Sequence, residues 1–344
     1  MGITGVTITI CLILFFNFSC GFNDSASIVS TIISSRAMGV RSALIMASIL
    51  VFSGSFLLGT AVAKTIGLGI VTINSMTIHG ILSAVIAATA WNVITWAIGL
   101  PSSTSHALIG GLIGAALQLS GINSIQWLNV LGILGVIFAS PLLGFFVSYH
   151  MATMNFLIFR HMNPVAATNI LKKLQIISGA FLAVSYGTND AQKAMGLITL
   201  SLSIYYCIDP HGLAGLYTSG SCGTFVVPWW VMLISSASLS IGMLSGGTRI
   251  IKTIGTKLFR IRPIHGFGAM LSAAIIVSTC SLIGFPVSTT QIASSAVVGG
   301  GASQRMSIVR WGSTRDILLT WMLTIPASAL LAYLLAYFLK WIGW

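Results

Sequence analysis

Long runs of apolar residues dominate the chain, and only a few short polar clusters interrupt them. Seven runs approach or exceed the roughly 20 apolar residues that a helix needs to cross the hydrocarbon core of a bilayer. The runs lie at about 3–20, 42–63, 78–98, 128–150, 226–246, 268–284 and 316–340. No basic residue precedes the first run and no clear small-residue cleavage site follows it, which favours a retained helix over a signal peptide. The pattern predicts an all-α polytopic membrane protein with about 10–12 membrane segments.

Composition supports a protein of the membrane. Of 344 residues, 56% are hydrophobic and 6% charged, with a mean hydropathy of +0.99, whereas soluble chains carry about 25% charged residues. The net charge of +12 fits Lys and Arg gathered on cytoplasmic loops, so we expect no nucleic-acid partner. Five cysteines without a CxxC motif indicate neither a zinc nor a redox site. Cys207 and Cys222 flank one loop and could pair in an oxidising compartment.

Short motifs of the first half return in the same order in the second half. The pairs are "GFND" (21–24) with "GTND" (187–190), "AKTIG" (63–67) with "IKTIG" (251–255), "IHG" (78–80) with "IHG" (264–266), "GLPSSTSH" (99–106) with "GFPVSTTQ" (284–291), and Pro141 with Pro326. Such ordered matches predict a duplication. We assign residues 1–158 to a first repeat, 159–173 to a cytoplasmic linker and 174–344 to a second repeat.

The distribution of basic residues predicts that the repeats are inverted. The stretches 36–41, 249–262 and 303–315 are rich in Lys and Arg, and their counterparts in the other half are poor in them. By the positive-inside rule, these stretches and 160–173 lie inside the cell and both termini lie outside. Thirteen of the sixteen Lys and Arg residues are then inside. Inverted repeats with a midplane site are typical of secondary transporters.

The same topology requires 78–118 and 264–303 each to begin and end on one side of the membrane. Each contains a Pro among small polar residues between two apolar arms, which predicts a helical hairpin. Hydroxyls and free N–H groups at the start of the second arm form an anion site, helped by the positive end of the helix. The residues concerned are Ser103, Thr104 and Ser105 in the first repeat and Ser288, Thr289 and Thr290 in the second.

The two GxND motifs hold two of the four acidic residues of the chain. We expect the helix to break at each motif, because Gly, Asn and Asp are poor helix formers. Carbonyl groups, a carboxylate and an amide oxygen then make a hard oxygen site for a small cation, such as a sodium ion at Asp24 and Asp190. Gln192 and Lys193 add hydrogen-bond donors beside the second motif.

Carboxylates repel an anion unless cations separate them or the anion donates a proton. Hydrogen phosphate can donate its O–H to an ionised Asp, and sulfate cannot at neutral pH. The residues therefore favour phosphate over sulfate as the substrate.

These motifs resemble the duplicated signatures of the inorganic phosphate transporter (PiT) family, which usually reads GANDVANA, GANDVQKAMG and, in each hairpin, PVSTTH. The resemblance extends from about residue 17 to 335. It implies cation-coupled phosphate uptake, without a cofactor, by a chain that often forms a homodimer. It places Asn23, Asp24, Asn189 and Asp190 in the cation and substrate cluster, the six hairpin Ser and Thr residues on the phosphate, and Gln192 and Lys193 on the family's QK pair.

The chain departs from the family pattern at several positions. Ser27 stands where the family has its second Asn, Tyr186 stands where a His is common, and Gln291 replaces the second hairpin His, although His106 is kept. We treat Ser27, His106 and Gln291 as accessory site residues. These departures leave sodium, proton and metal–phosphate coupling open.

Four other functions are alternatives to the transport of phosphate. A sulfate permease of the same fold is the nearest alternative, and an intramembrane aspartyl protease, a channel and a hydrolase are remote ones. The flanks of the two Asp residues lack the YD and GxGD patterns of the protease, and neither GxSxG nor HExxH occurs. We expect a transporter rather than an enzyme, in a prokaryotic plasma membrane.

Overall fold

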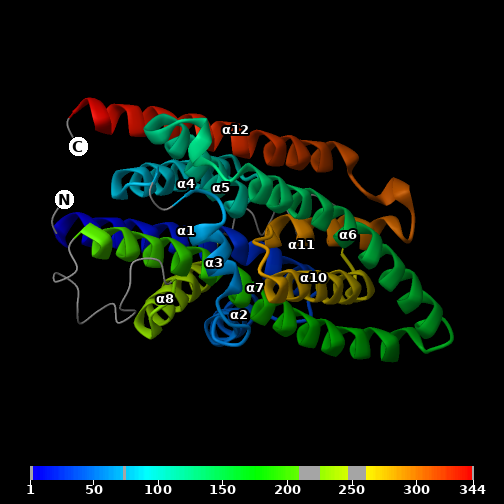
Figure 1. Ribbon diagram of the computed structural model, residues 1–344. Coiled ribbons are helices and arrows are strands. Elements are labelled where there is room, and N and C mark those ends of the chain that lie inside the picture. Colours follow the sequence, from blue (N-terminus) through cyan, green and yellow to red (C-terminus); the bar gives the residue numbers. More distant parts are fainter. Residues whose placement is uncertain (1–2, 73–74, 209–224, 247–260, 343–344) are drawn as a thin grey trace.

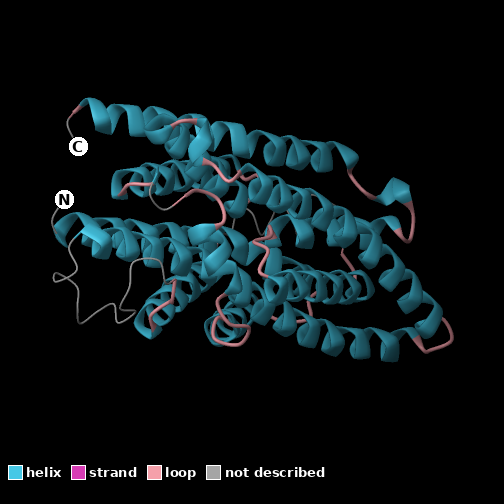
Figure 2. Ribbon diagram, in the orientation of Figure 1, coloured by secondary structure: helices cyan, strands magenta, loops and turns pink. Residues whose placement is uncertain are grey.

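The computed structural model describes residues 3–72, 75–208, 225–246 and 261–342. Within those ranges the chain is a bundle of helices joined by loops (Figure 2), and the one β-bridge joins Val71 to Ile125. Residues 3–159 form α1 (Ile3–Ser34), α2 (Val40–Gly54), α3 (Ala61–Leu68), α4 (Ile78–Ile98), α5 (Thr104–Ser120) and α6 (Trp127–Phe159). Residues 164–341 form α7 (Pro164–Ile208), α8 (Trp229–Ser245), α10 (Pro263–Ile283), α11 (Thr289–Ala302) and α12 (Trp311–Trp341).

Five of the described helices, α1, α4, α6, α10 and α12, are long and apolar enough to cross a membrane, and α2 and α8 are shorter apolar helices. The outer faces of α6 and α12 expose large apolar side chains such as Leu142, Phe146, Met322 and Leu330, as expected for helices in contact with lipid. The all-α polytopic membrane fold is therefore confirmed. The number of membrane segments stays a prediction.

The order of elements in the first half recurs in the second, and the halves exchange packing partners. Helix α1 packs against α8, and α7 against α2. Likewise α5 packs against α12, and α11 against α6 (Figure 1). Pro141 in α6 and Pro326 in α12 both lie inside a helix. This pattern is what a duplication would produce, while the inversion of the repeats and their boundaries stay predictions.

The expected helix breaks at the two GxND motifs are wrong, because α1 and α7 run through them without interruption. The glycines serve close helix packing instead. A Cβ atom on Gly21 would lie 2.1 Å from the carbonyl oxygen of Leu239 in α8, and one on Gly187 would lie 2.1 Å from that of Val51 in α2. Small residues at such positions let two membrane helices approach closely, so tertiary packing outweighs the low helix propensity of Gly.

The two helical hairpins are confirmed. Helix α4 ends at Gly99 and α10 at Gly284, both with left-handed backbone, at φ 78° and 87°. A short non-helical stretch containing Pro101 or Pro286 follows, and α5 and α11 then turn back against the first arm of each hairpin. Ser103 and Ser288 cap α5 and α11 by accepting hydrogen bonds from the amides of His106 and Gln291.

The first and last described helices begin and end, respectively, at the same end of the bundle. The start of α1 and the end of α12 lie at one end of the bundle, and the α6–α7 connection and the segment before α12 lie at the other (Figure 1). That α6–α7 connection spans residues 160–163, and α7 begins at Pro164, within the stretch expected as a linker. Cys222 and the "IKTIG" motif at 251–255 lie outside the described residues, as does the side chain of Cys207.

Candidate functional site

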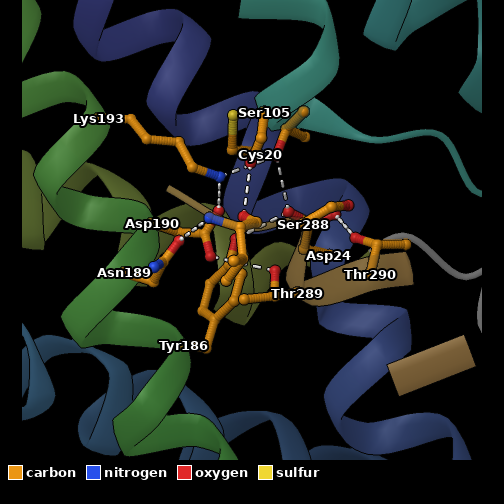
Figure 3. Close-up of polar contacts among 12 residues, drawn as sticks. Cys20, Asp24, Ser105, Tyr186, Asn189, Asp190, Lys193, Ser288, Thr289 and Thr290 are labelled. Carbon is orange, nitrogen blue, oxygen red and sulfur yellow. Dashed lines mark hydrogen bonds and ion pairs between the residues drawn. The ribbon is translucent and has the colours of Figure 1, made fainter. Parts of the chain in front are cut away.

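Four polar segments converge in the interior of the bundle. The middle of α1 and the middle of α7 carry Asp24 and Asp190, and the first turns of α5 and α11 meet them from the hairpin tips (Figure 3). Asp24, Asp190 and Lys193 are each only 1% exposed. Buried charges of this kind are costly in a membrane and mark functional sites.

Asp24 is surrounded by hydroxyl groups from three other elements. Its Oδ1 accepts a hydrogen bond from Thr290 of α11 at 2.5 Å. Its Oδ2 accepts from Thr104 of α5 and from the phenol of Tyr186 in α7, both at 3.2 Å. Donors from both halves therefore share one carboxylate. No Lys or Arg is paired with Asp24 in the described part of the chain.

Asp190 has a different set of partners. Its Oδ1 forms an ion pair with the ammonium group of Lys193, one turn along α7, and its Oδ2 accepts a hydrogen bond from Thr289 at 3.1 Å. The same ammonium group donates to the hydroxyl of Thr104 at 3.5 Å. Lys193 thus links the second carboxylate to the tip of the first hairpin.

The two Asn residues of the GxND motifs anchor the helices to the hairpins unequally. Asn189 donates to the Ser281 hydroxyl at 3.0 Å and to the Phe285 carbonyl at 3.4 Å, and its Oδ1 accepts from the amide of Val287 at 3.4 Å. Asn23 donates to the carbonyl of Asn92 at 3.3 Å, and its Oδ1 has no hydrogen-bond donor among the described residues. One motif is therefore fully bonded and the other keeps a free acceptor oxygen.

The hairpin tips also contact each other. Ser105 donates to the carbonyl of Val287 in the opposite tip at 2.7 Å. The accessory pair His106 and Gln291 bridges the hairpins through Nδ1 and Nε2 at 2.9 Å. These contacts hold the N-terminal ends of α5 and α11 against each other, so that the first turns of both helices lie beside the carboxylates.

Two residues expected at the site, Gln192 and Ser27, do not contact the carboxylates through hydrogen bonds. Gln192 accepts from the amide of Ala63 in α3 at 3.1 Å and donates to the Thr188 carbonyl at 2.6 Å. Its amide group thus secures α3 against α7. Ser27 is buried on α1, and its hydroxyl has no partner among the described residues. Neither side chain takes part in the hydrogen bonds that join the carboxylates to the hairpin tips.

Sequence reasoning missed three participants, Tyr186, Asn92 and Ser281. Tyr186 was noted only as a departure from the family pattern, yet its hydroxyl bonds Asp24. Asn92, a rare amide on an apolar helix, donates to Ser19 at 3.4 Å and presents its carbonyl to Asn23. The isolated Asn in α4 was a usable signal. Ser281 carried none, because small hydroxyl residues are common throughout these helices.

The geometry defines what the cluster can do chemically. Three Thr hydroxyls and one Tyr hydroxyl donate to two carboxylates, and one ammonium group supplies a positive charge. Oxygen-rich clusters of this kind suit a small hard cation, and hydroxyls at helix starts suit an oxyanion. The interior position closes the cluster to solvent on all sides.

Comparison with known proteins agrees with this chemistry. A model of a family described as the phosphate transporter family matches residues 20–332. A Bacillus subtilis protein named a probable low-affinity inorganic phosphate transporter is 38% identical over 337 residues, covering 97% of this chain and 96% of that protein. A Rhizobium meliloti protein with the same name is 37% identical over 326 residues, covering 94% of this chain and 93% of that protein.

A solved structure shares the fold. The structure described as the sodium-dependent phosphate transporter superposes with a TM-score of 0.86 and is 25% identical, covering 99% of this chain and 100% of that one. The resemblance noted in the sequence is therefore confirmed by the family match, by the curated relatives and by the fold.

Proposed function

This chain belongs to the phosphate transporter family, and we propose that it imports inorganic phosphate together with a cation by alternating access. It is an integral membrane transporter and not an enzyme, which removes the protease and hydrolase alternatives.

One observation carries the coupling proposal: the hairpin hydroxyls expected to bind phosphate are donating to the protein's own carboxylates. Thr104 and Thr290 donate to Asp24, and Thr289 donates to Asp190. A hydroxyl has one proton to donate. It cannot serve a carboxylate and a phosphate oxygen at once. Phosphate must therefore compete with Asp24 and Asp190 for the same donors.

A cation resolves this competition. When sodium or a proton neutralises a carboxylate, the threonine hydroxyls become free to turn toward phosphate. The cation then binds first, and phosphate binds to the donors it releases. Two ligands that each make the other's binding more favourable are linked reciprocally, which is what symport requires.

The first motif is the better place for the coupling cation. Asp24 accepts hydrogen bonds from hydroxyl groups only, and the preceding residue, Asn23, has an Oδ1 without a hydrogen-bond donor among the described residues. Asp190 already has the ammonium group of Lys193 as its counter-ion. We therefore assign the sodium ion or proton to Asp24 and Asn23. The sodium-dependent description of the structural relative supports sodium.

Burial of the cluster supports alternating access. Because Asp24 is only 1% exposed, substrate entry requires one hairpin to move against α1 and α7. The interaction between Ser105 and Val287 is the contact that such a movement would break. A plasma membrane location, termini outside and a homodimer complete the proposal. The bacterial relatives support the first. The start of α1 and the end of α12 lie at the same end of the bundle (Figure 1), which supports placing both termini on one side, and the positive-inside rule makes that side the outside.

The test is uptake of radiolabelled phosphate into proteoliposomes under an imposed sodium or proton gradient. We expect the sodium gradient to drive uptake, and Asp24→Asn to abolish it while the variant binds phosphate without sodium. Excess sulfate is the control for the nearest alternative substrate and should leave uptake unchanged. Absence of uptake under both gradients, in protein shown to be folded, would refute the proposal.

A further inference from the structure

An apolar cavity lies on the lipid-facing side of the bundle, apart from the buried cluster. It measures about 530 Å³ and is formed by α6, α11 and α12. We propose that it binds an acyl chain of an anionic phospholipid whose headgroup is held by Arg310 and Arg315.

The walls suit a hydrocarbon chain that enters from the bilayer. Leu142 of α6 and Met322 of α12 line the cavity and are 63% and 67% exposed, so the cavity opens on faces that lipid covers. Phe138 and Phe145 complete the wall on α6. The volume lies within the range of about 300–1,000 Å³ found for small-molecule sites.

The headgroup end is marked by arginines and a tryptophan. Trp311, Thr314 and Leu318 of α12 line the cavity. Arg315 follows Trp311 by four residues and precedes Leu318 by three, so it borders the same face of the helix. Arg310 precedes Trp311 directly. Tryptophan is enriched at membrane interfaces.

Both arginines are exposed, and neither forms an ion pair in the described part of the chain. Asp316, also exposed, is the only acidic residue of α12. A guanidinium group binds a phosphate oxygen pair in a bidentate fashion, which favours a phosphodiester headgroup. Positive charge on this segment also selects an anionic lipid over a neutral one.

The floor connects the cavity to both hairpins. Ser294, which is 2% exposed, lines the cavity, and its hydroxyl has no hydrogen-bond partner among the described residues. Gln291 lines it and bonds His106 of the first hairpin. Trp321 lines it and donates to the carbonyl of Pro101 at 3.1 Å. A lipid in the cavity would therefore stabilise the positions of both hairpin tips. The relevance of this effect to transport rests on the proposed function, but the binding of the lipid does not depend on it.

Lipid retention in native mass spectra tests the binding. Protein is extracted from nanodiscs that contain equal amounts of phosphatidylglycerol and phosphatidylcholine, and bound lipids are counted. We expect phosphatidylglycerol to be retained about tenfold over phosphatidylcholine. Arg310→Gln with Arg315→Gln should remove the preference, and Ser295→Phe, which fills the cavity, should remove retention of both lipids. Lys340→Gln and Leu330→Phe, on the same helix away from the cavity, are the matched controls.

The outcomes separate cleanly. Equal retention of the two lipids by the native chain would overturn the proposal. The proposal would also be overturned if Ser295→Phe converted a dimer to a monomer and left lipid retention unchanged. A second copy of the chain, and not a lipid, would then be the group that covers the cavity. Failure of phosphate uptake in every lipid, with selective phosphatidylglycerol retention intact, would refute the proposed function alone and leave the lipid site standing.

Discussion

Asp24 and Asp190 hold equivalent places in the two GxND motifs, but they are compensated in different ways. Asp190 has an ion-pair partner on its own helix, Lys193, and one threonine donor. Asp24 has three hydroxyl donors and no ion-pair partner within the described residues. Counting along the motifs, Ser27 is the counterpart of Lys193, and Cys20 that of Tyr186.

The difference shows how two similar motifs can take different roles at one site. A lysine in the second half gives one carboxylate a permanent counter-ion, and a tyrosine from the same half donates to the other carboxylate. Under the proposed function, the second motif serves as a fixed scaffold and the first binds the exchangeable cation.

Removal of the permanent counter-ion should have the largest effect. Lys193→Met leaves Asp190 as an unpaired buried carboxylate, and breaking a buried pair from one side typically costs about 3–5 kcal/mol. We expect a marked fall in thermal stability in detergent and no phosphate uptake. Ser27→Ala, at the equivalent place in α1, is the control and should keep its stability. A stable Lys193→Met variant would show that the ion pair is not structural.

Neutralisation of each carboxylate should separate stability from transport. Asp190→Asn leaves the ammonium group of Lys193 without its partner and should lower stability by about 3 kcal/mol. Asp24→Asn removes a buried charge that has no ion-pair partner among the described residues. It keeps one acceptor oxygen and replaces the other with an NH2 donor, which a rotated neighbouring hydroxyl can accept, so stability should stay within about 1 kcal/mol. Both should lose gradient-driven uptake. Equal losses of stability, measured by thermal denaturation, would contradict the division of tasks.

Loss of the phenol donor should weaken the first site selectively. Tyr186→Phe removes one hydrogen bond to Asp24, and such bonds to charged groups contribute about 1.5–3 kcal/mol. We expect the sodium concentration for half-maximal uptake to rise at least tenfold, and the phosphate concentration for half-maximal uptake to change less. Cys20→Ala, at the equivalent position, is the comparison. An unaltered sodium dependence would remove Tyr186 from the coupling site.

Truncation of the motif amides should give the smallest effect. Asn189→Ala removes the acceptor of the Val287 amide and the donor to Ser281, whose hydroxyl keeps its own bond to the Val277 carbonyl, and should cost about 1–2 kcal/mol. Asn23→Ala loses a single hydrogen bond at 3.3 Å and should cost less. Thermal stability measures both. A larger loss in Asn23→Ala would show that the first motif is the more firmly anchored one.

Local sequence patterns alone predicted the membrane-helical class, the two hairpins and the pair of carboxylates that meet in the interior of the bundle. These depend on local properties: runs of apolar residues long enough to span a bilayer, and Gly and Pro, which end one helix and allow the next to start. Thr104, Thr289 and Thr290 were placed correctly at the hairpin tips because a helix start follows directly from the Pro–Ser/Thr pattern.

Other features depend on contacts between segments that are far apart in the sequence. Helices α1 and α7 continue through GxND because Gly21 and Gly187 let α8 and α2 approach closely, a contact between segments far apart in the chain. The same holds for Gln192, which bonds α3 rather than the cluster, and for Tyr186, which reaches Asp24 across 162 residues. A hydrogen bond depends on where a partner lies in space, and local sequence patterns carry no information about a partner on another helix.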